Sequence, residues 1–255
     1  MTSPSSAGIA LVTGAARRIG RHIALALARA GWDVAVHYNR SREEADTLVR
    51  EIEALGRRAL AVQGELGDEA QVRTLLPQAA PLGRITCVVN NASLFDYDDA
   101  ASFGNDRLLR HMSANVGAPV LLAQALFEAT PEGQQAVVIN LLDQKLYNPN
   151  PDFLSYTLSK AALHSATTLL AQALAPKVRV VGVAPGLTMV SGDQTEDQFD
   201  KAHTVTPLGR GSTPEDIAAA VCYVASARAV TGTTLLVDGG QHLLPLSRDV
   251  MFVAK

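Results

Sequence analysis

Short β-branched runs alternate with longer segments of helical periodicity along almost the whole chain. The candidate strands are 9–13, 33–37, 59–63, 85–90, 136–141, 178–183 and 234–237. The candidate helices are 19–30, 42–55, 69–78, 107–129, 154–174 and 214–225. Such alternation is typical of βαβ units, whose helices cover both faces of a mostly parallel sheet. The sequence therefore predicts a doubly wound α/β fold with a seven-stranded sheet.

The length of 255 residues and the 47% hydrophobic content suit one large domain spanning 1–255. No low-complexity linker or fixed-period repeat divides the chain. The longest stretch without clear periodicity is 187–207, between the sixth strand and the last helix. We expect this segment to be a lid over a substrate, although its acidic middle, 191–200, is equally compatible with an ordinary mobile surface loop.

The charge pattern and the cysteines exclude several classes of partner. The net charge is −3 and the basic residues are scattered, so we expect no nucleic-acid partner. No apolar run approaches about 18 residues and the N-terminal tract 1–8 lacks the features of a signal peptide, so we expect no membrane partner and a cytoplasmic location. Cys87 and Cys222 have no His or Cys at ligand spacing, which indicates buried thiols and no metal site.

The first strand leads directly into the glycine-containing sequence TGAARRIG at 13–20, which opens a helix. A strand, a glycine turn and a helix in this order are the context of a dinucleotide-binding site. Gly14 would permit the tight turn and Gly20 the close packing of helix on sheet, while the helix N-terminus would face a pyrophosphate. The alternative is a tight turn that only starts a helix.

The second strand ends in the sequence HYNRS at 37–41, which carries no acidic residue. NAD-specific sites place an Asp or Glu on the ribose about 20 residues after the turn. Asp33 begins this strand and therefore lies at its wrong end. Arg40 and Ser41 instead offer a cation and a hydroxyl to a 2′-phosphate, which predicts NADPH as the cofactor, unless Arg40 is only a solvated surface charge.

Tyr156 and Lys160 form an i,i+4 pair on the predicted helix 154–174, so both side chains share one face. Lowering the pKa of a tyrosine by about three units takes roughly 4 kcal/mol from positive charge or hydrogen bonds. Lys160, together with an oxidised nicotinamide, is the candidate source. By itself the spacing also fits a buried tyrosine beside a lysine that extends to solvent.

Together these segments resemble the short-chain dehydrogenase/reductase family over nearly the whole chain, including NNAS at 90–93 and VAPG at 183–186. The resemblance implies a Rossmann-type fold, with Tyr156 as general acid and Lys160 on the nicotinamide ribose. It also implies that the turn at 185–186 lies beside the carboxamide and that Asn115 belongs to a proton relay. An isolated asparagine is more often a local backbone partner.

Three residues depart from the general family pattern and are similar to those of pteridine reductases. Arg18 replaces the middle glycine of the dinucleotide turn, and Asp143 stands 13 residues before Tyr156, where most members have serine. A neutral Asp143 could donate a proton, whereas an ionised one would repel a developing oxyanion. Phe95, in NASLF, resembles the phenylalanine that stacks a pterin on nicotinamide. The alternatives are a loop cap for Asp143 and core packing for Phe95.

The predicted function is therefore the NADPH-dependent reduction of a pteridine (dihydrobiopterin, dihydromonapterin or dihydrofolate). The resemblance also implies a homotetramer. One alternative is a carbonyl reductase of another small planar or alicyclic ketone. A second is a non-catalytic dinucleotide sensor, against which the intact Tyr156 and Lys160 argue.

The predicted site is as follows. The expected cofactor-binding residues are Gly14, Arg17, Arg18, Ile19, Gly20, Tyr38, Asn39, Arg40, Ser41, Glu65, Leu66, Asn91, Ala92, Ser93, Lys160, Pro185 and Gly186. The expected substrate-binding residues are Arg18, Ser93, Phe95, Asp143, Tyr156 and Leu187. The expected catalytic residues are Asp143, Tyr156, Lys160 and Asn115.

Overall fold

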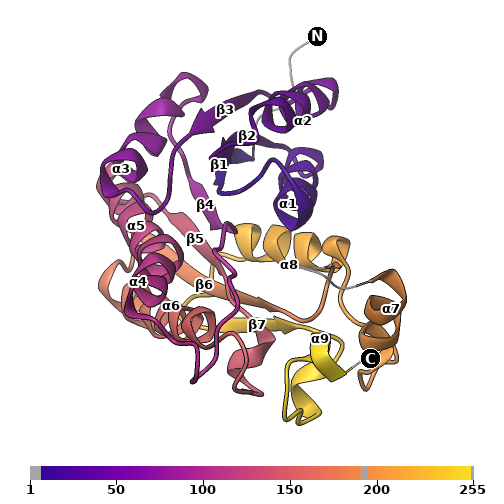
Figure 1. Ribbon diagram of the computed structural model, residues 1–255. Helices are drawn as coiled ribbons and strands as arrows, with labels where there is room; N and C mark the ends of the chain where they lie inside the picture. Colours follow the sequence, from indigo (N-terminus) through magenta and orange to yellow (C-terminus); the bar gives the residue numbers. More distant parts are fainter. Residues whose placement is uncertain (1–6, 191–194, 254–255) are drawn as a thin grey trace.

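The computed structural model describes residues 7–190 and 195–253. Residues 1–6 of the N-terminal tract and residues 191–194 of the predicted lid lie outside the described residues. The described residues form one seven-stranded parallel sheet in the order β3-β2-β1-β4-β5-β6-β7 (Figure 1). The strands are β1 (Gly8–Val12), β2 (Trp32–Tyr38), β3 (Ala59–Gln63), β4 (Cys87–Asn90), β5 (Ala136–Leu141), β6 (Val178–Pro185) and β7 (Thr234–Val237). The predicted fold class and all seven strands are confirmed, with ends that differ by at most two residues.

Helices cover both faces of the sheet (Figure 1). One face carries α1 (Arg18–Arg29), α2 (Arg42–Ala54) and α8 (Pro214–Ser226). The other carries α3 (Glu69–Gln78), α4 (Asn105–Met112), α5 (Ala118–Ala129) and α6 (Leu154–Ala173). β2 is buried at every position, as expected of a parallel strand between two helical layers. In β1, Ala10 and Val12 enter the core on the α1 side, whereas Ile9 and Leu11 enter the opposite core.

The predicted continuous helix 107–129 is wrong in detail. The structure has α4 and α5 joined by a π-helical turn, Ser113–Gly117. Pro119 lies in the first turn of α5 and has no amide hydrogen to donate to the preceding turn, so the regular hydrogen-bond ladder is interrupted there. This turn carries Asn115 and presents its side chain to the loop after β4.

Two short helices in the C-terminal half of the chain were not predicted from the sequence. α7 (Glu196–Thr204) lies within the predicted lid, and α9 (Val250–Val253) lies near the end of the described chain. Elements of four to nine residues are too short to show a helical pattern above the background. No helix among the described residues combines the length and the apolar character needed to span a membrane.

The chain order reverses between β1 and β4, which lie side by side at the centre of the sheet. β1 continues outward to β2 and β3 on one side, and β4 continues to β5, β6 and β7 on the other. In open parallel sheets, ligands bind at this switch point, outside the carboxyl ends of the strands. The loops after β1, β4, β5 and β6 all emerge there, so the topology brings the predicted site segments together.

Candidate active site

The turn between β1 and α1 requires glycine at two positions. Gly14 has φ +60°, in the left-handed region that glycine adopts without strain. A Cβ atom at Gly20 would lie 2.3 Å from the carbonyl oxygen of Gly14, so a side chain there would displace the turn. Arg18 also has a positive φ, +52°, at the position where the family commonly has glycine. The turn therefore keeps a glycine-like backbone but adds a guanidinium.

Two neighbouring strands hold this turn in place. The Gly14 amide donates to Nδ1 of His37 at 3.0 Å, and Nε2 of His37 lies 3.0 Å from the Gly64 carbonyl oxygen. Nδ2 of Asn91 donates to the Thr13 carbonyl at 2.9 Å, and Oγ1 of Thr13 accepts from the Asn91 amide at 3.0 Å. Asn91 thus supports the turn, and its expected contact with the cofactor stays a prediction, whereas the role of His37 was not apparent from the sequence.

At the end of β2, Arg40 is exposed and no acidic side chain of the described residues pairs with it. Asn39 donates instead to the Glu65 carboxylate, whose other oxygen accepts from the Gly67 amide at 3.1 Å. Arg17 forms an ion pair with Glu44 on the surface. The glycine turn and the unpaired cation of Arg40 fit a phosphorylated dinucleotide.

The centre of the site is a cluster of the buried Tyr156 and Lys160 with the half-buried Asp143. Asp143 follows β5, and the other two residues lie on one face of α6. The Tyr156 hydroxyl donates to Oδ2 of Asp143 at 2.7 Å, and Nζ of Lys160 donates to the Leu141 carbonyl at 2.7 Å. Asp143 also caps the following 3₁₀ turn, because its Oδ1 accepts from the Lys145 amide at 2.8 Å. Oδ1 of Asp143 therefore caps the loop, as in the alternative interpretation, while Oδ2 accepts from Tyr156.

Burial dominates the electrostatics of this cluster. Burial raises the pKa of Asp143 and lowers the pKa of Lys160 to about 8. Burial, followed by the charge and hydrogen bond of Asp143, raises the pKa of Tyr156 well above its ordinary value. In the protein alone the nearest ionisable partner of the phenol is the Asp143 carboxyl, and the expectation that Lys160 together with an oxidised nicotinamide lowers the pKa of Tyr156 stays a prediction. The hydroxyl proton of Tyr156 therefore lies in a hydrogen bond to the Asp143 carboxyl.

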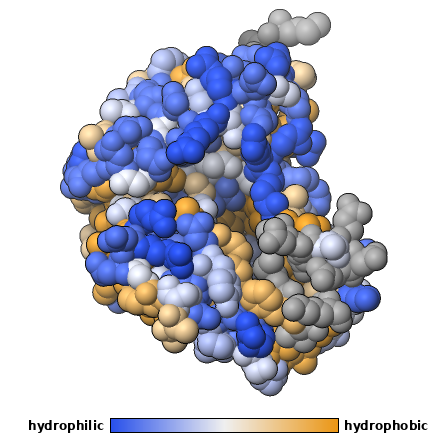
Figure 2. Space-filling view, viewed as in Figure 1, coloured by the Kyte–Doolittle hydropathy of each residue, from blue (hydrophilic) through white to orange (hydrophobic). Residues whose placement is uncertain are grey.

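A cavity of about 220 Å³ opens beside this cluster. Figure 2 shows that this side of the molecule is hollowed near its middle, below a largely hydrophilic rim. The expected residues that line the cavity are Arg18, Ile19, Asn91, Ser93, Phe95, Asp143, Tyr156, Lys160, Pro185, Gly186 and Leu187. The structure thus brings most of the predicted catalytic and substrate residues to one place.

Phe95 forms an aromatic wall of the cavity. Its ring stacks on Phe153 at 4.3 Å between centroids and meets the Tyr156 ring edge-on at 4.6 Å. It nevertheless remains 41% exposed, more than a core phenylalanine would be. Packing and exposure therefore coexist at Phe95, and its exposed area is available to a flat ligand.

Two other expected residues make contacts that the sequence did not predict. Arg18 donates to the Val190 carbonyl at 2.8 Å, so the dinucleotide turn contacts the first part of the predicted lid. Asn115 is buried, donates to the Leu94 carbonyl at 3.0 Å and accepts from the Leu94 amide at 2.7 Å. Asn115 thus holds the loop that carries Phe95, and its part in a proton relay stays a prediction.

The sequence analysis did not assign several residues that line the cavity to the site, among them Lys145, Gln241, Asp249 and Val250. Oε1 of Gln241 accepts from the Leu187 amide at 2.9 Å and so holds the loop after β6. The only sequence signal for Lys145 was its position two residues after Asp143. Asp249 and Val250 belong to no motif, and only folding brings them to the site.

Comparison with known proteins agrees with this arrangement. A family profile described as Enoyl-(Acyl carrier protein) reductase matches residues 14–242. The fold, the dinucleotide turn and the Tyr156–Lys160 pair define an oxidoreductase built on a nucleotide-binding sheet, and the chain belongs to the short-chain dehydrogenase/reductase family.

Relatives within this family bear several names. The structure of FolM alternative dihydrofolate reductase 1 from Brucella suis in complex with NADP superposes with a TM-score of 0.90, at 41% identity over 95% of this chain and 98% of that one. Pteridine reductase 1 of Leishmania tarentolae is 32% identical, covering 95% of this chain and 99% of its own. L-rhamnose 1-dehydrogenase (NAD(P)(+)) of Sphingomonas sp. (strain SKA58) is 34% identical over 91% and 95%.

Proposed function

We propose that this protein uses NADPH to reduce a pteridine, either a dihydropterin or dihydrofolate. One observation carries the proposal: the Tyr156 hydroxyl donates to a carboxyl group, Asp143, at 2.7 Å, where the family commonly has serine. The exposed Phe95 beside this pair adds a surface for a flat ring. Similarity to the Brucella suis dihydrofolate reductase and the Leishmania tarentolae pteridine reductase supports the same substrate class.

NADPH would lie across the carboxyl ends of β1, β2 and β4, and when bound it supplies the hydride. The amides at the start of α1 would bind the pyrophosphate, since a helix N-terminus favours negative charge. Arg40 and Ser41 would bind the 2′-phosphate, and Lys160 the nicotinamide ribose. The known structure of the Brucella suis relative with NADP supports this cofactor. Glu65 would face the adenine and also holds Asn39.

The proton would come from the Asp143–Tyr156 pair. The raised pKa of Tyr156 keeps the phenol protonated at neutral pH, and the raised pKa of Asp143 favours its proton-bearing form compared with an exposed carboxyl. Either group could then pass a proton to a ring nitrogen directly or through one water. A serine at position 143 could donate a hydrogen bond but could not supply an acidic proton.

The substrate ring would lie between Phe95 and the nicotinamide, with Arg18 at its edge. Arg18 is already fixed by its bond to the Val190 carbonyl, so its guanidinium has a defined position beside the cavity. We also propose that 187–207 covers the bound substrate, because Leu187, Thr188 and Met189 line the cavity.

The second candidate is a carbonyl reductase of another small planar or alicyclic ketone. The Tyr156–Lys160 pair is not specific to pteridines, and the Sphingomonas relative is a sugar dehydrogenase, so related sites act on other substrates. A non-catalytic sensor is the least supported, because the Tyr156 hydroxyl already donates to the Asp143 carboxyl beside the cavity and Lys160 lies on the same helix face.

We further propose that the enzyme is a cytoplasmic homotetramer. Leu109 on α4 and Leu158 and Leu169 on α6 are 53%, 45% and 64% exposed, which suits helices that pack against another copy. Light scattering coupled to size-exclusion chromatography measures the assembly directly.

The test of function is NADPH oxidation with dihydrobiopterin, dihydromonapterin and dihydrofolate beside a panel of ketones. Asp143→Ser should lower pteridine turnover about tenfold or more, since it removes the acidic proton. Asp106→Ser, at an exposed position on α4, is the matched control and should retain wild-type turnover. Turnover of ketones alone by the wild type would favour the second candidate, and NADPH binding without any turnover would favour a sensor.

A further inference from the structure

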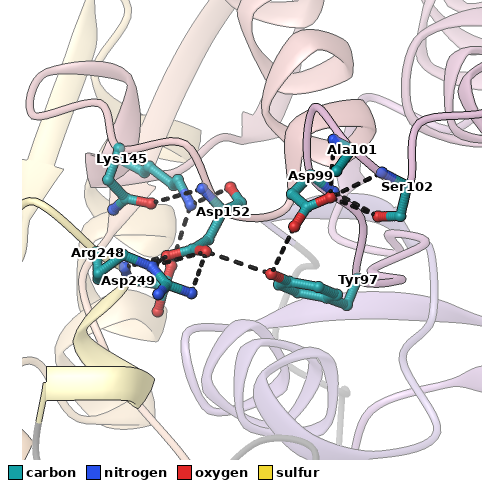
Figure 3. Close-up of polar contacts among 9 residues, drawn as sticks. Tyr97, Asp99, Ala101, Ser102, Lys145, Asp152, Arg248 and Asp249 are labelled. Atoms are coloured by element: carbon teal, nitrogen blue, oxygen red, sulfur yellow. Dashed lines mark hydrogen bonds and ion pairs between the residues drawn. The ribbon is translucent and has the colours of Figure 1, made fainter.

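The C-terminal residues 248–253 are anchored next to the candidate active site by an ion pair between the exposed Arg248 and the buried Asp152 (Figure 3). Asp152 is 2% exposed and accepts two bonds from the Arg248 guanidinium, each at 2.8 Å to a different carboxylate oxygen. It also accepts from the Asp249 amide at 2.7 Å. A two-pronged arginine–carboxylate pair has a fixed geometry, so it sets the position of Asp249.

Lys145 connects this anchor to Asp143. Its side chain is buried, and Nζ donates to the Asp152 carbonyl at 2.6 Å and to Oδ2 of Asp249 at 3.1 Å. Its backbone amide donates to Oδ1 of Asp143 at 2.8 Å. Figure 3 shows the Lys145 side chain beside Asp152 and Asp249, which it contacts. One residue therefore joins the C-terminal segment to the carboxyl group of the proposed proton donor.

A second connection runs through aromatic rings. Phe252 stacks on Phe153 at 6.2 Å between centroids, with 17° between their planes. Phe153 stacks in turn on Phe95, the aromatic wall of the cavity. The C-terminal segment thus contacts both sides of the site, the proton donor through Lys145 and the aromatic wall through Phe153.

We propose that Asp249 and Lys145 are positioning residues of the reduction, through which the C-terminal segment sets the orientation and the charge around Asp143. This inference rests on the proposed function only in assigning Asp143 the role of proton donor. Neither residue belongs to a motif of the family pattern described above, and Asp249 lies 104 positions from Lys145 in the chain.

The charges that face Asp143 determine the direction of the effect. They are Tyr156 and Lys160 from α6, Lys145 from the 3₁₀ turn after β5, and Asp249 from the C-terminal segment. The negative charge of Asp249 raises the pKa of Asp143, whereas Lys160 and the bond from Tyr156 lower it. A neutral residue at position 249 would remove the contribution of Asp249 that raises the pKa of Asp143 and would leave the lowering contribution of Lys160. Asp143 would then lose its proton at a lower pH.

The first experiment follows the Asp143 carboxyl by ¹³C NMR titration, with the signal assigned by its loss in Asp143→Asn. Asp249→Asn should shift the midpoint to lower pH by at least about 0.5 unit. Asp249→Glu keeps the negative charge, so its midpoint should lie close to that of the wild type. Asp106→Asn, an exposed site on α4, is the matched control and should leave the midpoint unchanged.

The second experiment measures steady-state kinetics of the same variants with dihydrobiopterin, or with the best ketone of the panel. Asp249→Asn should lower kcat at least about fivefold, with the Kd of NADPH within about twofold of the wild type. Lys145→Met should lower kcat in the same way, and thermal unfolding checks that it is folded. If it is not, Asp249→Asn alone decides.

The NMR titration needs no substrate, so failure of this inference is separable from failure of the proposed function. If Asp249→Asn shifts the Asp143 midpoint and the wild-type enzyme reduces only ketones, the positioning role stands and the pteridine assignment is rejected. A midpoint and a kcat in Asp249→Asn equal to those of the wild type would overturn the inference.

Discussion

The Gly14 amide donates a hydrogen bond to Nδ1 of His37 at 3.0 Å, and this contact joins the dinucleotide turn to β2. Because Nδ1 accepts, the ring proton lies on Nε2, which donates to the Gly64 carbonyl at 3.0 Å. Burial lowers the pKa of His37, so the imidazole is neutral at neutral pH. In a protonated ring Nδ1 also carries a hydrogen, so it could no longer accept from the Gly14 amide and this bond would be lost.

His37 should therefore make the stability of the protein depend on pH. Its pKa is lower in the folded state than the ordinary 6.5, so its contribution is complete above about pH 6.5 and is lost as the pH falls toward the folded-state pKa. His37→Phe should lower the Tm at pH 8, and the gap to the wild type should narrow by pH 5. A gap that is constant over this range would contradict the account.

Arg40 should decide the choice of cofactor. Wild-type kcat/KM should be higher with NADPH than with NADH, since the Arg40 guanidinium and the Ser41 hydroxyl suit a 2′-phosphate. Arg40→Asp should flatten or invert this ratio by replacing the cation with a carboxylate. Arg50→Asp, at an exposed position of α2, should keep the wild-type ratio. Equal kcat/KM of the wild type with both cofactors would reject the role of Arg40.

Tyr156→Phe should lower kcat at least about a hundredfold, because it removes a general acid, while the Kd of NADPH changes little. The variant also removes a bond that lowers the pKa of Asp143, so the remaining carboxyl should hold its proton to higher pH. Tyr147→Phe, a half-exposed tyrosine, serves as the control. Retained activity in Tyr156→Phe would transfer the role of proton donor to Asp143.

Phe95→Ala should raise the KM for pteridines severalfold with a smaller effect on kcat. Stacking on an aromatic face contributes roughly 0.5–1.5 kcal/mol beyond burial, and planar antifolates should lose affinity in parallel. Phe103→Ala is a closely matched control, because Phe103 is 43% exposed compared with 41% for Phe95. An unchanged KM in Phe95→Ala would place the ring of the substrate elsewhere.

Local patterns in the sequence were sufficient to predict the fold and the central residues of the site. The alternation of strands and helices predicted the seven-stranded sheet, since periodicity of apolar residues reports the secondary structure that buries them. The spacing of Tyr156 and Lys160 predicted a shared helix face, because four residues make about one helical turn. Gly14 and Gly20 marked a turn that tolerates no side chain.

Only the tertiary structure decided what surrounds these residues. The acceptor role of His37, the link from Asp143 through Lys145 to Asp249, and the raised pKa of Tyr156 all depend on groups far apart in the chain. The pKa of a buried group is set by desolvation and by the charges that packing brings near it, and neither is encoded in local spacing. The sequence by itself therefore determined which residues could carry the chemistry, and folding determined their protonation and their partners.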